Sequence, residues 1–82
     1  MWGRKMELYV LTRSGTKMLP LLRKEGRELE ANILEYLRMS EGATVEQVAD
    51  VMNLEQKTAY DELRSLSAKR WVWRKTTKLA PF

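Results

Sequence analysis

The sequence predicts a small α+β domain in which three helices form the core and a short, basic β-hairpin follows them. Residues 28–39 carry apolar side chains at helical spacing, and residues 44–66 hold two helical patterns separated by a short break. Residues 71–82 combine aromatic and β-branched residues with a polar, basic middle, which is typical of a hairpin. We therefore interpret residues 28–82 as the main domain and residues 1–27 as a basic N-terminal extension with a strand and a short helix.

Composition restricts the chemistry of this chain of 82 residues. It contains no cysteine and no histidine, which excludes disulfides, thiolate metal sites, cysteine nucleophiles and histidine acid–base catalysis. It also lacks a glycine-rich phosphate loop and a nucleophile with a neighbouring base. We expect no enzyme activity, no cofactor, no metal and no small-molecule ligand. The sequence has no secretory segment and no apolar run of transmembrane length, so a cytoplasmic protein without membrane contact is expected.

Charge is distributed unevenly along the chain, whose formal net charge is +4. Residues 1–27 carry seven basic and two acidic side chains, residues 28–62 carry two basic and nine acidic, and residues 63–82 carry six basic and none acidic. Two cationic ends therefore flank an acidic middle. Such ends suit a polyanionic partner, because each phosphate that Lys or Arg neutralises releases a condensed counterion.

The N-terminal extension is expected to hold a strand and a helix. Residues 6–11 are rich in apolar, β-branched and aromatic residues, which favours a strand. Thr12 or Ser14 then caps a short helix that ends at Gly26. Pro20 must lie in its first turn or kink it, because an interior proline removes a backbone hydrogen bond. The apolar residues of this helix are Met18, Leu19, Leu21 and Leu22.

Residues 28–39 form the clearest predicted helix and serve as the scaffold. Its apolar stripe consists of Leu29, Ile33, Leu34, Tyr36 and Leu37. Gly42 stands at a natural position for the loop that follows. Residues 43–45 are expected to add a short strand segment before the next helix.

Residues 44–66 predict a helix, a turn and a second helix. Thr44 and Gln47 have the spacing of a capping box, in which each side chain satisfies a free backbone donor at the start of a helix. Asn53 tolerates the left-handed conformation that ends a helix, and Leu54 fills the corner behind it. The core side of the first helix consists of Val45, Val48, Ala49 and Met52, and that of the second of Ala59, Leu63 and Leu66.

The second helix, which starts near Glu55, presents a polar face opposite its apolar one. Helix, short turn, helix is the layout of the DNA-binding helix-turn-helix, with the second helix as the reading element. Asp61 and Glu62 oppose contact with phosphates. The polar side chains that can reach base edges or phosphates are Gln56, Lys57, Thr58, Tyr60 and Arg64.

The C-terminal segment, residues 71–82, is predicted to form the basic hairpin. Its tip lacks Gly and Asn-Gly, so the turn type is not specified. Trp71 and Trp73 alternate onto one face, where we expect them to pack in the core. The cations and hydroxyls expected on the phosphate backbone are Lys69, Arg70, Arg74, Lys75, Thr76, Thr77 and Lys78.

Taken in order, these elements resemble the winged-helix superfamily, and in particular the MarR-like and ArsR-like regulators. The resemblance covers residues 28–78 and implies a winged helix-turn-helix fold and double-stranded DNA as the partner of a small transcriptional regulator. Arg70 departs from the pattern, which usually has Gly there. The segment YVLTRSGTKML also resembles the LT-x-x-G-x-x-x-L segment that follows the wing in many archaeal members, but here it precedes the first helix, so its role is not expected to carry over. The matching residues are Ile33, Leu34, Leu37, Thr44, Val48, Ala49, Leu54, Thr58, Leu63, Leu66, Trp71 and Val72.

Other interpretations remain open at this level. The polar face of the second helix is also what a solvated helix presents, Tyr60 also suits a protein interface, and a charged hairpin protects a strand edge from aggregation. The N-terminal extension is either a basic arm or a homodimerisation element, given its excess of apolar residues. The acidic middle segment favours a second function, a winged-helix module that binds protein within a replication or transcription assembly.

Overall fold

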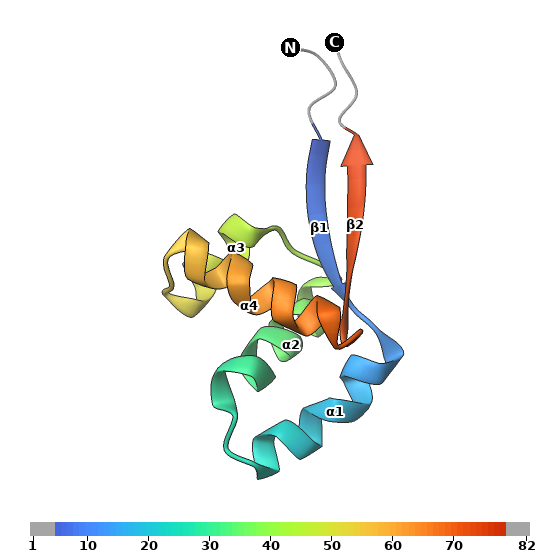
Figure 1. Ribbon diagram of the computed structural model, residues 1–82, viewed down its shortest axis with the longest axis vertical. Helices are drawn as coiled ribbons and strands as arrows, with labels where there is room; N and C mark the ends of the chain where they lie inside the picture. The colour runs from blue at the N-terminus through green and yellow to red at the C-terminus, as the bar shows by residue number, and fades with distance from the viewer. Residues whose placement is uncertain (1–4, 79–82) are drawn as a thin grey trace.

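The computed structural model describes residues 5–78, and the side chains of residues 7–76 (Figure 1). Over that range the protein is a small α+β structure with four helices and a two-stranded antiparallel sheet. None of these helices has the length and apolar character needed to cross a membrane. The elements are β1 (Lys5–Leu11), α1 (Arg13–Lys24), α2 (Glu28–Ser40), α3 (Val45–Met52), α4 (Gln56–Ala68) and β2 (Val72–Lys78).

The sheet joins the first and last described elements of the chain. β1 pairs with β2 from Lys5 opposite Lys78 to Leu11 opposite Val72. The ribbon projects away from the helices (Figure 1), and Lys5 and Lys78, the first and last described residues, pair at its far end. At its base, β1 is fixed to the loop before α3, because Tyr9 and Ala43 exchange backbone hydrogen bonds of 2.8 and 3.0 Å.

The predicted C-terminal hairpin is wrong. Residues 74–78, where its tip was expected, run straight through β2, and the strand beside them is β1. The segment has no residue that favours the tight hairpin turns, and β1, with its run of apolar and aromatic residues, supplies a partner. The prediction extended to residue 82, and residues 79–82 lie outside the described part of the chain.

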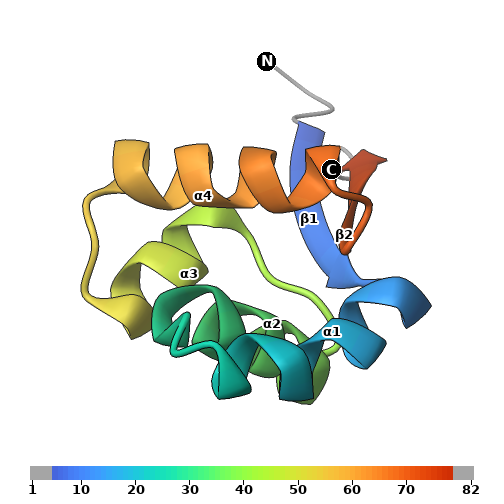
Figure 2. The same cartoon turned by 60° about the horizontal axis from the view of Figure 1, so that its bottom comes forward.

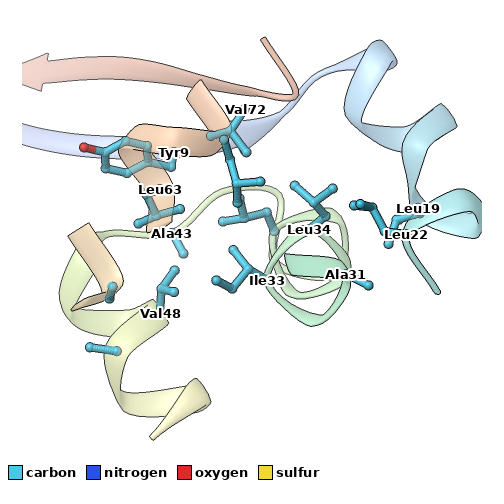
Figure 3. Close-up of a cluster of buried hydrophobic side chains, with 14 residues drawn as sticks. Tyr9, Leu19, Leu22, Ala31, Ile33, Leu34, Ala43, Val48, Leu63 and Val72 are labelled. Carbon is cyan, nitrogen blue, oxygen red and sulfur yellow. The ribbon is translucent and has the colours of Figure 1, made fainter. Parts of the chain in front are cut away.

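A single core lies among the four helices and the base of the ribbon. α4 crosses over the layer that α1 and α2 form, as Figure 2 shows. The strand and helix expected as an N-terminal extension contribute Tyr9, Leu19 and Leu22 to the same core as Ile33, Leu34, Val48 and Leu63 (Figure 3). The other buried apolar residues are Ala31, Leu37, Ala43, Ala49, Ala59, Leu66 and Val72.

The predicted helix ends are confirmed where they depend on neighbouring residues. Thr44 and Gln47 form both hydrogen bonds of the capping box, at 3.0 and 3.2 Å. Asn53 ends α3 in the left-handed conformation, with φ 57°. The Thr12 hydroxyl accepts a 3.0 Å hydrogen bond from the Gly15 N–H and so caps α1. Pro20 lies in the interior of α1 and not in its first turn.

The end of α4 explains the departure noted at Arg70. Arg70 has φ 65°, so an arginine occupies a left-handed position of the type usually given to glycine. Its N–H donates to the carbonyl of Ser67 at 3.0 Å, and the Trp71 N–H donates to that of Leu66 at 3.1 Å. This pair of hydrogen bonds is a Schellman motif. The Thr12 hydroxyl donates to the Arg70 carbonyl at 2.7 Å, so the turn is fastened to the start of α1.

Candidate nucleic-acid interface

A groove of about 630 Å³ lies between α4 and the ribbon. Tyr60, Arg64, Ser67 and Ala68 recur at helical spacing, so they form one stripe of α4 along this groove. Among the described residues that line it, the groove combines two arginines with three aromatic residues and includes no acidic one. These lining residues are Tyr9, Tyr60, Arg64, Ser67, Ala68, Trp73 and Arg74.

Strand register brings Arg74 to this groove. Arg74 stands opposite Tyr9, and residues paired in an antiparallel sheet lie on the same face. Tyr9 is only 2% exposed and faces the helices, so the exposed Arg74 lies on the helix side of the ribbon as well. The chain thus brings Arg64 from a helix and Arg74 from a strand to one concave surface.

The pKa of Tyr9, at the base of the groove, depends on its burial and on the groups around it. Burial raises the pKa of Tyr9 above its ordinary value of 10.0, and the neighbouring Glu7 carboxylate raises it further. Arg74 opposes this rise in the pKa of Tyr9, and Tyr60 contributes to it. The Tyr9 phenol is therefore neutral at physiological pH, and the positive charge of the groove comes from its two arginines.

The residues predicted for the phosphate backbone do not lie together. Strand alternation puts Lys75 on the face opposite Arg74, beside Leu8, and leaves Thr76 on the same face as Arg74. The backbone of Thr77 and Lys78 belongs to β2, but their side chains lie outside the described ones. Among the members of this predicted group whose side chains are described, Arg74 alone lines the groove.

Lys69 and Arg70 lie away from the groove, at the end of α4. The Lys69 ammonium is 3.5 Å from the Glu30 carboxylate and 4.9 Å from the centre of the Trp71 ring. This places Lys69 against the start of α2, where its charge is already paired. Arg70 occupies the turn that follows.

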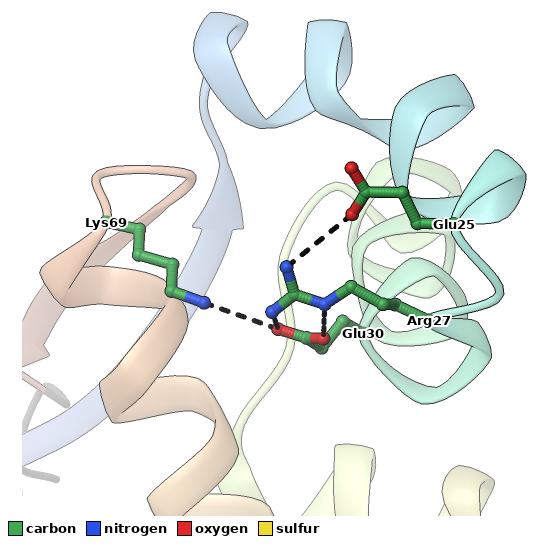
Figure 4. Close-up of polar contacts among 4 residues, drawn as sticks. All are labelled: Glu25, Arg27, Glu30 and Lys69. Carbon is green, nitrogen blue, oxygen red and sulfur yellow. Dashed lines mark hydrogen bonds and ion pairs between the residues drawn. The ribbon is translucent and has the colours of Figure 1, made fainter.

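Glu30 belongs to an ion-pair cluster that sequence reasoning missed (Figure 4). Arg27 donates to both carboxylate oxygens of Glu30, at 2.5 and 2.6 Å, and lies 3.9 Å from Glu25. The hydrogen bond to Glu30 is the main reason that the pKa of Arg27 is raised. The i, i+3 spacing of Arg27 and Glu30 could have indicated the first contact. Lys69 is remote in sequence and gave no such signal.

The remaining residues predicted on the reading helix are exposed but not all on one stripe. Lys57 extends the stripe of Tyr60 and Arg64 toward the start of α4, beside Gln56. Thr58 lies one helical turn before Glu62, and Glu62 lies near the start of α2. Asp61, also exposed, lies between Lys57 and Arg64 on the helix surface.

Trp73 corrects the prediction that both tryptophans are core residues. Trp73 is 63% exposed, whereas Val72 beside it is 1% exposed and fills the core. The reason is the register: Val72 pairs with Leu11 near the base of the ribbon, and its neighbour must point the other way. Trp71 lies before the strand and is partly buried. The place of Tyr9 in the groove was not foreseen because the partner strand of β2 was not known from the sequence. Trp73 borders the groove but pairs with Val10, so its side chain lies on the ribbon face opposite Tyr9 and Arg74.

The apolar residues that suggested a homodimer pack largely in the core of the same chain. Leu19 and Leu22 are buried and Met18 packs against the core. Of these four α1 residues, Leu21 is the exposed one, with 50% of its surface accessible. The surface that motivated the dimer expectation is therefore small.

Comparison with known proteins found no matching family model, no matching curated protein and no matching solved structure. Among residues 5–78, no group of three or more Asp and Glu side chains is arranged to hold a metal ion. The groove between α4 and the ribbon is the candidate site on which a functional assignment rests.

Proposed function

We propose that this protein binds double-stranded DNA as a small winged-helix transcriptional regulator. α4 enters the major groove, and the β1–β2 ribbon lies along the phosphate backbone as a wing. The observation that carries the proposal is that Arg64 of α4 and Arg74 of β2 line one groove, whose described lining residues include no acidic one. Guanidinium groups fit phosphate oxygens with two parallel hydrogen bonds, so two of them on one concave surface suit a nucleic-acid backbone.

The order of the elements supports a winged helix whose wing is built from two distant strands. α2, the Ala43 bridge, α3, α4 and β2 follow the order that the resemblance implies. β1 stands where the second strand of a wing hairpin belongs, and Thr12 with Gly15 leads from it into α1. In archaeal winged helices a similar LT-x-x-G segment follows the wing. We infer that this chain has the same elements in a rotated order.

Different residues contact the bases and the phosphates. Gln56, Lys57 and Tyr60 at the exposed start of α4 reach base edges, as helix side chains do in a major groove about 12 Å wide. Arg64 and Arg74 hold phosphates and so set the register of the helix on the duplex. Lys69 contributes little, because Glu30 already neutralises it.

The test is the binding of a labelled 20-base-pair duplex, followed by fluorescence anisotropy. Arg64→Ala combined with Arg74→Ala removes two charges from the groove. Lys17→Ala combined with Lys24→Ala removes two exposed charges from α1 and serves as the matched control. If each guanidinium contributes about 1 to 1.5 kcal/mol, the groove variant weakens binding by roughly 30- to 150-fold. The control changes affinity by less than about threefold, through long-range charge alone.

Equal losses in the two variants would mean that general positive charge, and not the groove, attracts DNA. No binding of the folded wild-type protein at low salt would contradict the proposal altogether. That result would favour the protein-interaction function, and the acidic surface around Glu46 and Asp50 of α3 would be the next to test.

A further inference from the structure

The outer side of β2 carries free backbone hydrogen-bonding groups. Tyr9 exchanges both of its backbone hydrogen bonds with Ala43, so its N–H and C=O groups point away from β2. Arg74 stands opposite Tyr9, and the backbone groups of two opposed residues in an antiparallel pair either meet or both point away. The backbone groups of Arg74, and of Thr76 two residues further on, therefore point to the outer side of β2.

No element in the described part of the chain occupies that side. The backbone groups of Arg74 and Thr76 have no partner in the described helices, loops or strands. Figure 1 shows no helix or strand beyond the outer side of β2 along the projecting part of the ribbon. Such an edge can accept a further strand. Peptides that add to a sheet edge gain affinity from main-chain hydrogen bonds and specificity from alternate side chains.

The side chains of β2 select the chemistry of an added strand. Arg74 lies on the ribbon face that carries Tyr9, whereas Trp73 and Lys75 lie on the opposite face. All three β2 side chains are exposed, and neither cation forms a salt bridge with a described residue. A second copy of β2 would bring like charges opposite each other, which is destabilising. An acidic strand would bring opposite charges together instead.

We propose that the outer edge of β2 binds an extended, acidic segment of another protein as a third, antiparallel strand. The antiparallel arrangement continues the pairing of the ribbon and is slightly more stable per residue than a parallel one. Cross-strand pairing puts one acidic residue opposite Lys75, a second opposite Arg74 and an apolar residue opposite Trp73. The favoured segment therefore reads acidic, acidic, apolar from its N-terminal side. This inference goes beyond the proposed function, because the partner is a protein and not DNA.

The first test measures the fluorescence anisotropy of a labelled peptide, TTEEVT, titrated with the wild-type protein. It should bind at least about 30-fold more tightly than TTKKVT, which cannot form the two ion pairs. Arg74→Ala should weaken the binding of TTEEVT about 5- to 12-fold. Lys24→Ala, which removes an exposed cation of α1, is the matched control and should change the affinity less than about threefold.

Two N-methylated forms of TTEEVT test strand addition itself. In the antiparallel pair the second glutamate, opposite Arg74, donates its N–H to β2, whereas the N–H of the first glutamate, opposite Lys75, points away. Methylation of the second glutamate N–H should weaken binding by about tenfold or more, because it removes a main-chain hydrogen bond. Methylation of the first should weaken it less than about threefold. Equal affinities of the two forms, or a loss confined to the first, overturn the proposal.

Two further outcomes overturn the proposal. One is the absence of saturable binding of TTEEVT up to about 1 mM, and the other is equal binding of TTEEVT and TTKKVT. Circular dichroism of each protein variant verifies that it is folded. Because these measurements contain no DNA, a failure of strand addition leaves the proposed function intact, and a failure of duplex binding leaves strand addition intact.

Discussion

Tyr9 and Arg74 stand directly opposite each other in the ribbon, one buried and the other exposed beside it. The core fixes the phenol ring, and the register then fixes where the guanidinium emerges. A shift of the register by one residue would move Arg74 to the other face and remove it from the groove. The packing of Tyr9 therefore positions the strand side of the proposed DNA-binding surface.

Because Tyr9 is buried, we expect the free energy of unfolding to fall in alkaline solution. The pKa of Tyr9 is raised in the folded protein, chiefly by burial. Its stabilising contribution is fully present below the unfolded pKa near 10 and is lost as the pH rises through the folded pKa. Urea unfolding of the wild type should show a free energy that falls above about pH 10, with at most about 1.4 kcal/mol per pH unit due to Tyr9.

The control for this prediction is Tyr9→Phe, which keeps the ring and removes the titrating group. It should be less sensitive to pH between about 10 and 11 than the wild type, whatever the lysines contribute to both. Parallel curves for the two proteins would show that the burial of the phenol has no such effect.

Gly15 is the position in α1 where a methyl group cannot be accommodated. A Cβ there would lie 2.1 Å from the Trp71 carbonyl oxygen and 2.6 Å from Leu11 Cδ1. Gly→Ala within a helix ordinarily stabilises by up to about 1 kcal/mol. For Gly15→Ala we expect the opposite, a loss of about 3 kcal/mol or more in the free energy of unfolding, because the backbone must move to relieve the clash. Thermal unfolding of the variant and the wild type measures this loss.

Gly26→Ala is the comparison for that result. Gly26 has φ 78° but nothing within 4 Å of an added Cβ. The substitution should therefore lower the free energy of unfolding only through the left-handed backbone conformation, by about 1 to 2 kcal/mol. A Gly15→Ala variant as stable as the wild type would refute the close contact between α1 and the end of α4.

Arg70→Gly should stabilise the protein. The left-handed conformation costs a residue with a Cβ about 1 to 2 kcal/mol, and the greater flexibility of glycine in the unfolded chain offsets about half of that. We expect a net gain of about 0.5 to 1 kcal/mol in urea unfolding. Arg70→Ala retains the strained backbone and should gain nothing, so equal effects of the two substitutions would point to the lost side chain instead.

A rearranged chain tests the proposed order of elements. Lys78 lies opposite Lys5, so an Asn-Gly pair between them suits a two-residue hairpin turn. With these residues joined and the chain opened at the α1–α2 turn, between Glu25 and Gly26, the protein should fold and bind DNA as the original does. The far-ultraviolet circular dichroism spectrum and the duplex affinity provide the readouts. An unfolded product would argue against equivalence with a wing hairpin.

The elements foreseen from the sequence are those that neighbouring residues determine. The capping box of Thr44 and Gln47, the left-handed Asn53 and the buried Ala59, Leu63 and Leu66 all follow from spacings within a few residues. Pairing between β1 and β2 joins segments more than sixty residues apart, and no local pattern specifies it. The hairpin and the burial of Trp73 were mispredicted for that one reason.

The same distinction between local and long-range determinants applies to the candidate site. Tyr60 and Arg64 were recognisable because helical spacing separates the faces of α4. Whether Arg74 or Lys75 faces them depends on the register with β1, and the pairing of Lys69 with Glu30 depends on how α4 crosses α2. Among the five of these basic and hydroxyl residues whose side chains are described, tertiary packing thus brings only Arg74 to the groove.

The salt dependence of duplex binding tests the central claim most directly. If Arg64, Arg74 and two or three further cations contact phosphates, the logarithm of affinity should fall with the logarithm of salt concentration at a slope of about −4. Removing Arg64 and Arg74 together should reduce the slope to about −2, since each phosphate contact contributes about −0.9. A wild-type affinity that does not change between low and physiological salt would contradict DNA binding through this groove.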